Sequence, residues 1–370
     1  MNWALWAEII VKGSIVALGV QGCCAYLVFA ERRISSFMQD RIGPNRCGPF
    51  GLIQPLADAV KLIFKEDIVP DHVNKFFYFI APIISLLPAL ATLAVVPFGA
   101  DLVFKDGRVV DLQVADVNVG LLFVFALASL GVYGLALGGW SSGSKYSLLG
   151  GVRSAAQMIS YELPLTLSVL TVILVTGSLE LNAVVMDQGP WPWQWHIFGF
   201  GALSSSSLYW PWRLAAAVPM FIAGFVFMTS VFAETNRLPF DMPEAESELV
   251  SGYHTEYSAM KFGMFFIAEY ANMITGSALV VTIFFGGWMF PGWSSEFLRQ
   301  HQIIQGLLMV GTFMAKIAAF LFVMIWIRWT LPRFRFDQLM ELGWKRLLPI
   351  SLACVAAAAA LRVAADYLPS

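Results

Sequence analysis

The sequence predicts an all-α integral membrane protein with about eight transmembrane helices and a further amphipathic helix at the cytoplasmic membrane surface. Its 370 residues are 58% hydrophobic and only 13% charged, with a mean hydropathy of +0.70, whereas soluble domains carry about 25% charged residues. The apolar residues form long runs, and basic residues concentrate in alternate connections between these runs. A chain with so little charge cannot cover a water-facing surface, so lipid is its natural solvent.

The transmembrane helices are predicted from the length of the apolar runs. A helix needs about 20 apolar residues to cross about 30 Å of hydrocarbon, and in lipid its backbone polar groups must pair internally. We expect the whole chain, 1–370, to form a single membrane domain. Its eight spans are expected near residues 9–30, 76–98, 117–138, 157–177, 214–233, 262–290, 303–327 and 347–368.

The distribution of Lys and Arg predicts the orientation. The connection 31–75 alone contains Arg32, Arg33, Arg41 and Arg46, and the alternate connections that follow it are also basic. Cytoplasmic loops carry the excess of basic residues in membrane proteins. These connections are therefore predicted to be cytoplasmic, and an even number of spans then places both termini on the outer side.

Two other functional classes are excluded by composition and spacing. No basic tract indicates binding to nucleic acid. The four cysteines, Cys23, Cys24, Cys47 and Cys354, show neither a C-x-x-C motif nor metal-ligand spacing with histidine. We therefore expect no metal ion and no iron–sulfur cluster in this chain.

The first cytoplasmic connection, 31–75, contains a predicted amphipathic helix. Within residues 49–66 the apolar side chains recur at helical spacing, while Asp58 and Lys61 share another face. The segment is too short and too charged to cross the bilayer, so we expect it to lie at the membrane interface.

Carboxylates are concentrated in and just after the connection 234–262, which also contains the basic residues Arg237 and Lys261. The acidic members are Glu234, Asp241, Glu244, Glu246, Glu248, Glu256 and Glu269. Crowding raises the pKa values of some carboxyl groups, and such groups can transfer protons near neutral pH. A solvated acidic loop is the alternative interpretation. Because apolar residues interrupt the acidic ones, we favour proton transfer.

Ionisable residues inside predicted spans also indicate function, because they are costly in lipid. Glu162 lies early in the fourth predicted span, just before Pro164, and Glu269 lies in the sixth. For Lys316, in the seventh span, the sequence favours neither a functional role nor simple neutralisation by a partner carboxylate.

The predicted outer connection 178–213 is rich in tryptophan. These side chains indicate either a docking surface for another protein of an assembly or an aromatic belt at the headgroup level, and we favour the belt.

Two long motifs carry a resemblance to a known family. Residues 31–67 read ERRISSFMQDRIGPNRCGPFGLIQPLADAVKLIFKED, and residues 232–270 read FAETNRLPFDMPEAESELVSGYHTEYSAMKFGMFFIAEY. Both resemble signature loops of the H-subunit family of respiratory complex I (NADH:quinone oxidoreductase), whose mitochondrial counterpart is NADH dehydrogenase subunit 1. The segment RSAAQMISYELPL at 153–165 is similar to the fourth span of that family.

The resemblance implies a function. Members of the family lie where the membrane arm joins the peripheral arm, form the quinone-chamber entrance, and hold no redox centre. It implies quinone as substrate, with NADH, FMN and iron–sulfur clusters in partner subunits. The expected partners are the other membrane-arm and peripheral-arm subunits and the lipid bilayer, in a bacterial inner membrane.

The resemblance also assigns roles by position. It places seven residues at or beside the chamber mouth: Glu31, Arg32, Arg41, Arg46, Asp58, Lys61 and Arg237. It places eight in an acidic relay for protons: Glu162, Glu234, Asp241, Glu244, Glu246, Glu248, Glu256 and Glu269.

Two alternative functions remain open. One is the equivalent anchor subunit of a membrane-bound hydrogenase or ferredoxin-dependent complex. A stand-alone secondary transporter is less favoured, since the internal repeats typical of such carriers are not evident in the sequence.

Overall fold

The structure, a computed structural model, describes residues 3–103, 109–198, 210–243, 246–293 and 295–367. The predicted all-α membrane fold is confirmed, since eight helical segments in this described part are long and apolar enough to span a bilayer. Seven are α1 (Trp3–Met38), α3 (Lys75–Ala91), α4 (Gly120–Ser141), α5 (Lys145–Thr176), α7 (Trp210–Glu234), α9 (Ala259–Phe284) and α11 (Gln302–Thr330). The eighth joins α12 (Phe336–Glu341) to α13 (Leu348–Tyr367) through a π-helical turn, Leu342–Leu347.

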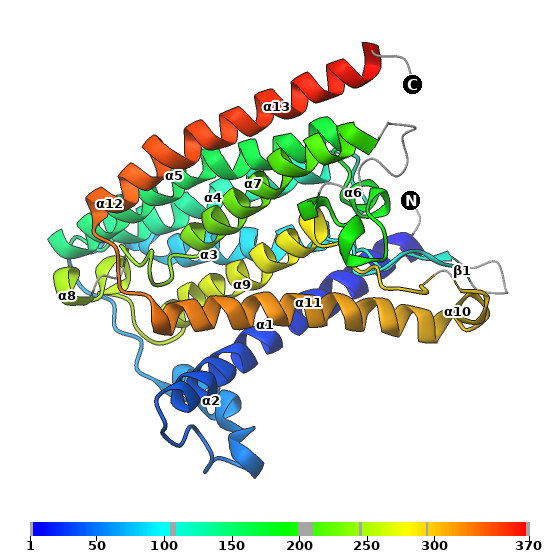
Figure 1. Cartoon of the computed structure of the whole chain (residues 1–370). Coiled ribbons are helices and arrows are strands. Elements are labelled where there is room, and N and C mark those ends of the chain that lie inside the picture. The colour runs from blue at the N-terminus through cyan, green and yellow to red at the C-terminus, as the bar shows by residue number, and fades with distance from the viewer. Residues whose placement is uncertain (1–2, 104–108, 199–209, 244–245, 294, 368–370) are drawn as a thin grey trace.

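Five of these helices form a closed ring, in which α3 packs on α4, α4 on α5, α5 on α7, α7 on α9, and α9 on α3. Outside the ring, α13 lies against α5 and α7, while α1 and α11 lie against α9 (Figure 1). Close approach of α3 and α4 requires Gly134, because a Cβ there would lie 2.6 Å from the Ser85 nitrogen. The main apolar core extends from the ring to α1 and α11.

Several helix boundaries differ from the predictions: α3 ends at Ala91 rather than near residue 98, α9 ends at Phe284 rather than near 290, and the eighth span begins at Phe336 rather than near 347. Two further differences lie close to the functional residues. Helix α1 continues to Met38, beyond the expected end near residue 30, and the Ser36 hydroxyl donates to the Arg32 carbonyl at 2.6 Å in this extension. Helix α5 begins at Lys145 rather than near residue 157. Both extra segments are charged, so apolar length does not reveal them. As a result Glu162 lies in the middle of its helix, not early in it.

The shorter elements lie mainly at the two ends of the bundle. At one end, the α8 end, are α2 (Gln54–Phe64), α8 (Glu246–Leu249) and the 3-10 turns Pro49–Gly51 and Gly252–His254. At the other, the α6 end, are α6 (Leu181–Asp187), α10 (Glu296–Gln300), the 3-10 turns Thr92–Ala94, Pro192–Gln194 and His196–Phe198, and an antiparallel pair of strands, β1 (Leu102–Val103) and β2 (Val109–Val110).

The position of the chain ends concerns the predicted orientation, and helix α2 concerns the predicted amphipathic helix. The N-terminal end of α1 and the C-terminal end of α13 lie together at the α6 end (Figure 1). Helix α2 packs against the extended part of α1 and against α9, on the outside of the ring. Its exposed apolar residues Leu56, Val60 and Ile63 confirm the predicted amphipathic helix, which is shorter than residues 49–66.

Candidate functional site

Arg237 is the centre of a buried charged cluster at the α8 end. Its side chain is 5% exposed and lies in the connection after α7. Its Nη1 is 3.5 Å from Glu31 Oε2, its Nε forms an ion pair with Glu269, and its guanidinium lies 4.2 Å from the centre of the Tyr270 ring. A buried charge is stable only when it is paired, and here the partners come from α1 and α9.

Glu31 has two further partners in this cluster. The Tyr270 hydroxyl donates to Glu31 Oε2 at 2.7 Å, and Arg328 of α11 forms an ion pair with the other carboxylate oxygen. We call these five residues, Glu31, Arg237, Glu269, Tyr270 and Arg328, the Arg237 cluster. Two arginines face two glutamates, so the ionised cluster is formally neutral, and protonation of either carboxylate leaves one positive charge in excess.

Gln157 holds the backbone on both sides of Arg237. This fully buried amide on α5 donates from Nε2 to the carbonyls of Ala233 and Phe240, at 2.7 Å in each case. Between them Asn236 adopts a φ of 53°, a left-handed conformation that asparagine tolerates better than most residues. The chain therefore turns sharply at the end of α7, and Arg237 is directed inward.

The rest of this connection is held by the segment that joins α11 to α12. Arg333 pairs with Asp241 at 2.7 Å, and the Phe334 amide donates to the Pro239 carbonyl at 3.1 Å. Asp241 is 7% exposed. The predicted acidic connection is therefore packed into the protein in this part.

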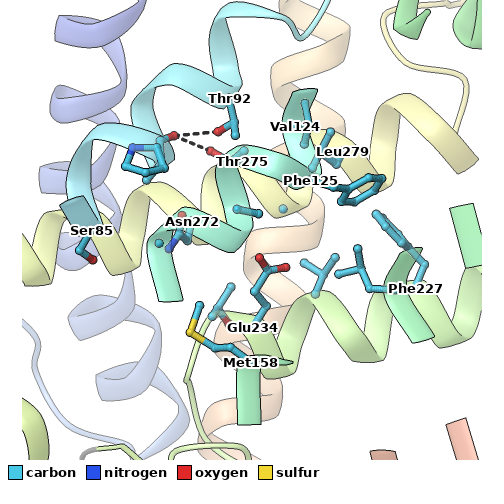
Figure 2. Close-up of a pocket in the computed structure, with 18 residues that line it drawn as sticks. Ser85, Thr92, Val124, Phe125, Met158, Phe227, Glu234, Asn272, Thr275 and Leu279 are labelled. Carbon is cyan, nitrogen blue, oxygen red and sulfur yellow. Dashed lines mark hydrogen bonds between the residues drawn. The ribbon is translucent and has the colours of Figure 1, made fainter. Parts of the chain in front are cut away.

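Two small cavities connect the Arg237 cluster with the interior of the helix ring. The larger, about 40 Å³, is lined by all five ring helices, and Figure 2 shows Glu234 pointing into it from α7. The smaller, about 20 Å³, is lined by Glu234 and by Glu269 of the cluster, and Asn272 lines both cavities. A cavity of about 10–15 Å³ can hold a water molecule, so each has room for at least one.

Glu162, on α5, lies near Glu234. It accepts a hydrogen bond from the Ser129 hydroxyl of α4, and its carboxylate is close enough to Glu234 to act on it electrostatically. Four of the predicted acidic residues, Glu162, Glu234, Glu269 and Glu31, therefore follow one another through the core.

The remaining predicted residues lie outside this buried series. Arg32 pairs with Asp58 at 2.8 Å and joins α1 to α2, and Glu248 pairs with Arg153 at 2.7 Å with its side chain 52% exposed. Glu256 is half-buried. Three basic residues are exposed: Arg41, Arg46 and Lys61. Glu244 and the side chain of Glu246 lie outside the described residues.

A second contact at the α8 end joins the connection 31–75 to the connection 234–262. Lys261 pairs with Asp67 at 2.8 Å, and the ring of Tyr78 stacks on Tyr257 with centroids 4.3 Å apart. Burial raises the pKa of Tyr257 to about 12. The connections 31–75 and 234–262 are therefore in direct contact, and the second of them also packs on α3 through Tyr257.

The sequence left open whether a carboxylate neutralises Lys316. In the structure, its partners are backbone carbonyls. Its ammonium group donates to the carbonyls of Phe285, Gly287 and Met289, at 2.9, 2.9 and 3.0 Å. These carbonyls follow the C-terminal end of α9, where the helix dipole favours a cation. Lys316 therefore caps α9.

Four residues of the site were not predicted: Gln157, Tyr270, Arg328 and Arg333. In the sequence, Arg328 and Arg333 contribute only to the basic connections that predict the membrane orientation. Nothing in their spacing distinguishes them from exposed arginines. Gln157 is a polar residue within the motif 153–165, which is the only signal that could have identified it.

Among the described residues no group of three His, Cys, Asp or Glu side chains is placed to hold a metal. The expectation of no metal stays a prediction.

Comparisons with known proteins agree with this architecture. The model of the NADH dehydrogenase family matches residues 11–359. The H subunit of NADH-quinone oxidoreductase from Leptospira biflexa is 46% identical over 369 residues, which cover 96% of this chain and 95% of the relative. The second H subunit of the enzyme from Koribacter versatilis is 48% identical, covering 93% and 94%, and subunit 8 from Rhodothermus marinus is 46% identical, covering 95% and 94%. This chain therefore belongs to the H-subunit family of NADH-quinone oxidoreductase and is a multi-pass membrane component of that enzyme.

Proposed function

We propose that this chain forms the entrance and lower wall of the quinone chamber, and that its buried acidic residues begin the relay that couples quinone reduction to proton translocation. The observation that carries the proposal is the Arg237 cluster: the smaller cavity is lined by its Glu269 and by Glu234, and Glu162 lies close enough to Glu234 to act on it electrostatically.

A hollow beside the extended part of α1 supports the position of the entrance. It has a volume of about 680 Å³ and is lined by Arg33, Phe37 and Arg41 of the α1 region and by Phe322 and Trp326 of α11. Apolar walls with a few polar groups are typical of small-molecule sites. A quinone, with a polar head and an apolar tail, fits such a lining.

The electrostatics of the cluster support the coupling. Quinone reduction consumes protons and places negative charge nearby, which raises the proton affinity of neighbouring carboxylates. When Glu31 takes up a proton, Arg237 loses one of its two anionic partners and attracts Glu269 more strongly. Water in the smaller cavity then connects Glu269 with Glu234, and the Glu162 carboxylate acts on Glu234 in turn.

The connection 234–262 would carry the structural part of the change. It holds Arg237, and its first part, up to Asp241, is fixed by Gln157 and Arg333. A shift of Arg237 therefore moves the segment that faces the rest of the assembly.

The assembly and its location complete the proposal. The other membrane-arm and peripheral-arm subunits are the partners, and NADH, FMN and the iron–sulfur clusters belong to those subunits. The bacterial relatives support a cell inner membrane. The basic connections at the α8 end support a cytoplasmic location for that end, with both termini on the outer side.

The test replaces Glu162 and Glu234 individually with glutamine in the assembled complex. Each change keeps the side-chain size but removes the titratable group, so we expect lower quinone reductase activity and a smaller proton gradient in vesicles, with assembly retained. Glu341→Gln is the matched control, because Glu341 is exposed and pairs only with Lys345 four residues along the helix. Normal turnover and a normal gradient in both core variants would refute the proton role.

A further inference from the structure

An apolar groove runs between α1 and α11 at the α6 end, on the outside of the helix ring. Its volume is about 420 Å³, and its walls include Ile15 and Gly19 of α1, Phe98, and Met314 and Ile317 of α11. It lies away from the Arg237 cluster, because Cys23, its last residue on α1, precedes Glu31 by eight positions, or about 12 Å along a helix.

The groove is open on the outer surface of the helix bundle. Ile15 and Leu18 on this part of α1 are 65% and 68% exposed, and a Cβ added at Gly19 would meet nothing within 4 Å. An apolar space of this size is not filled by water, and leaving it empty forfeits dispersion contacts along its whole lining. A chain of methylene groups from the bilayer is the occupant whose chemistry matches the walls.

The rim of the groove is polar and carries both signs of charge. Lys12, in the part of α1 nearest the N-terminus, lines the groove together with Asp111 and Gln113, which follow strand β2. Nearby, burial and the carboxylates of Asp111 and Asp116 raise the pKa of Asp101, while Lys12 acts in the opposite sense. A lysine at this depth extends toward the phosphate level of the membrane.

We propose that this groove binds one acyl chain of an amine-bearing phospholipid of the phosphatidylethanolamine type. The lipid phosphate pairs with Lys12, and its ammonium group pairs with Asp111. A phospholipid that carries only negative charge is attracted by Lys12 but is repelled by the carboxylates at the same rim. The proposal is independent of the quinone chamber, which lies at the opposite end of the bundle.

The test uses photo-crosslinking on the intact complex in vesicles of phosphatidylethanolamine and phosphatidylglycerol. A phosphatidylethanolamine probe with a diazirine in its acyl chain is activated, and the labelled peptides are mapped and quantified by mass spectrometry. We expect labelling of α1 near Gly19 and of α11 near Met314, and weaker labelling of both by the matching phosphatidylglycerol probe.

Two variants on the same helix separate the groove from general lipid contact. Gly19→Phe places a ring in the groove, and we expect labelling of α11 to fall about tenfold because the ring occupies the acyl position. Gly22→Phe is the matched control, since Gly22 is also exposed with nothing within 4 Å of a Cβ but does not line the groove. Gly19→Leu serves if the larger side chain prevents assembly.

Lys12→Met tests the headgroup contact. We expect it to lower labelling by both probes several-fold, because it removes the phosphate partner and leaves the carboxylates. Three results would overturn the proposal: equal labelling in the Gly19 and Gly22 variants, equal labelling by the two phospholipid probes, or displacement of the probe by a long-tailed quinone but not by unlabelled phosphatidylethanolamine.

Discussion

Arg237 and Lys316 are both basic side chains inside the bundle, and they are neutralised in opposite ways. Arg237, at the α8 end, is paired with the carboxylates of Glu31 and Glu269. Lys316, at the α6 end, donates to three backbone carbonyls and has the ring of Trp195 at 4.8 Å from its nitrogen.

The difference is that the partners of Arg237 can titrate, whereas the partners of Lys316 cannot. A carboxylate takes up a proton more readily when negative charge develops beside it, so the balance of charge around Arg237 can change with events nearby. A backbone carbonyl does not titrate, so the surroundings of Lys316 are fixed. We therefore expect changes at Arg237 to alter turnover, and changes at Lys316 to alter stability alone.

The largest effect is expected for Arg237→Met. Removing one partner of a buried ion pair costs about 3–5 kcal/mol, because the other charge is left uncompensated. The amount of this chain in the membrane and the NADH:quinone rate should both fall sharply. Arg335→Met provides the control, because that side chain is 75% exposed and pairs only with the exposed Asp337. Full assembly and full activity of the Arg237 variant would contradict the buried role.

Lys316→Met should have the next largest effect, on stability. Three carbonyls lose a charged donor, and leaving buried polar groups unsatisfied costs about 1–3 kcal/mol. The melting temperature of the purified complex should fall, whereas the rate per assembled complex and its pH profile should not change. A shifted pH profile without a change in melting temperature would place Lys316 in the relay instead.

Glu269→Gln tests whether charge, rather than shape, matters beside Arg237. Glutamine preserves the size of the side chain, so the complex should assemble, but turnover should fall about tenfold, equivalent to about 1.4 kcal/mol in the barrier. Quinone reduction and the proton gradient are measured on the same vesicles. Glu296→Gln, at an exposed position of α10, should leave both unchanged. The interpretation fails if Glu269→Gln matches this control.

The smallest effect on stability is expected for Arg32→Ala. The Arg32–Asp58 pair is substantially exposed, and exposed ion pairs contribute about 0.2–1 kcal/mol. The melting temperature of the complex that carries Arg32→Ala should hardly change. Its KM for a short-chain quinone should rise if Arg32 lies at the chamber mouth. Asp58→Ala, which breaks the same pair, shows how much of that rise comes from the pair itself. Unchanged kinetics would leave Arg32 as an anchor of topology only.

Sequence reasoning identified the membrane helices well because lipid imposes a simple rule on each one separately. It failed at the start of α5 and the end of α1, where charged residues continue a helix. Gly150 illustrates the reason: its lack of a side chain lets the Gly252–Tyr253 backbone approach, with a Cβ there only 2.7 Å from the Tyr253 nitrogen. That contact is made with a segment about a hundred residues away, which no local pattern contains.

The sequence by itself determined that this chain spans the membrane with eight helices and that its carboxylates concentrate in and after one connection. Hydrophobic length and residue type are properties of a segment, so they can be read along the chain. Only the tertiary structure decided that Glu31 and Glu269 share Arg237, while Glu248 pairs with Arg153 at the surface. Burial and charge pairing depend on which helix faces meet, and those faces are brought together only by the packing of the whole bundle.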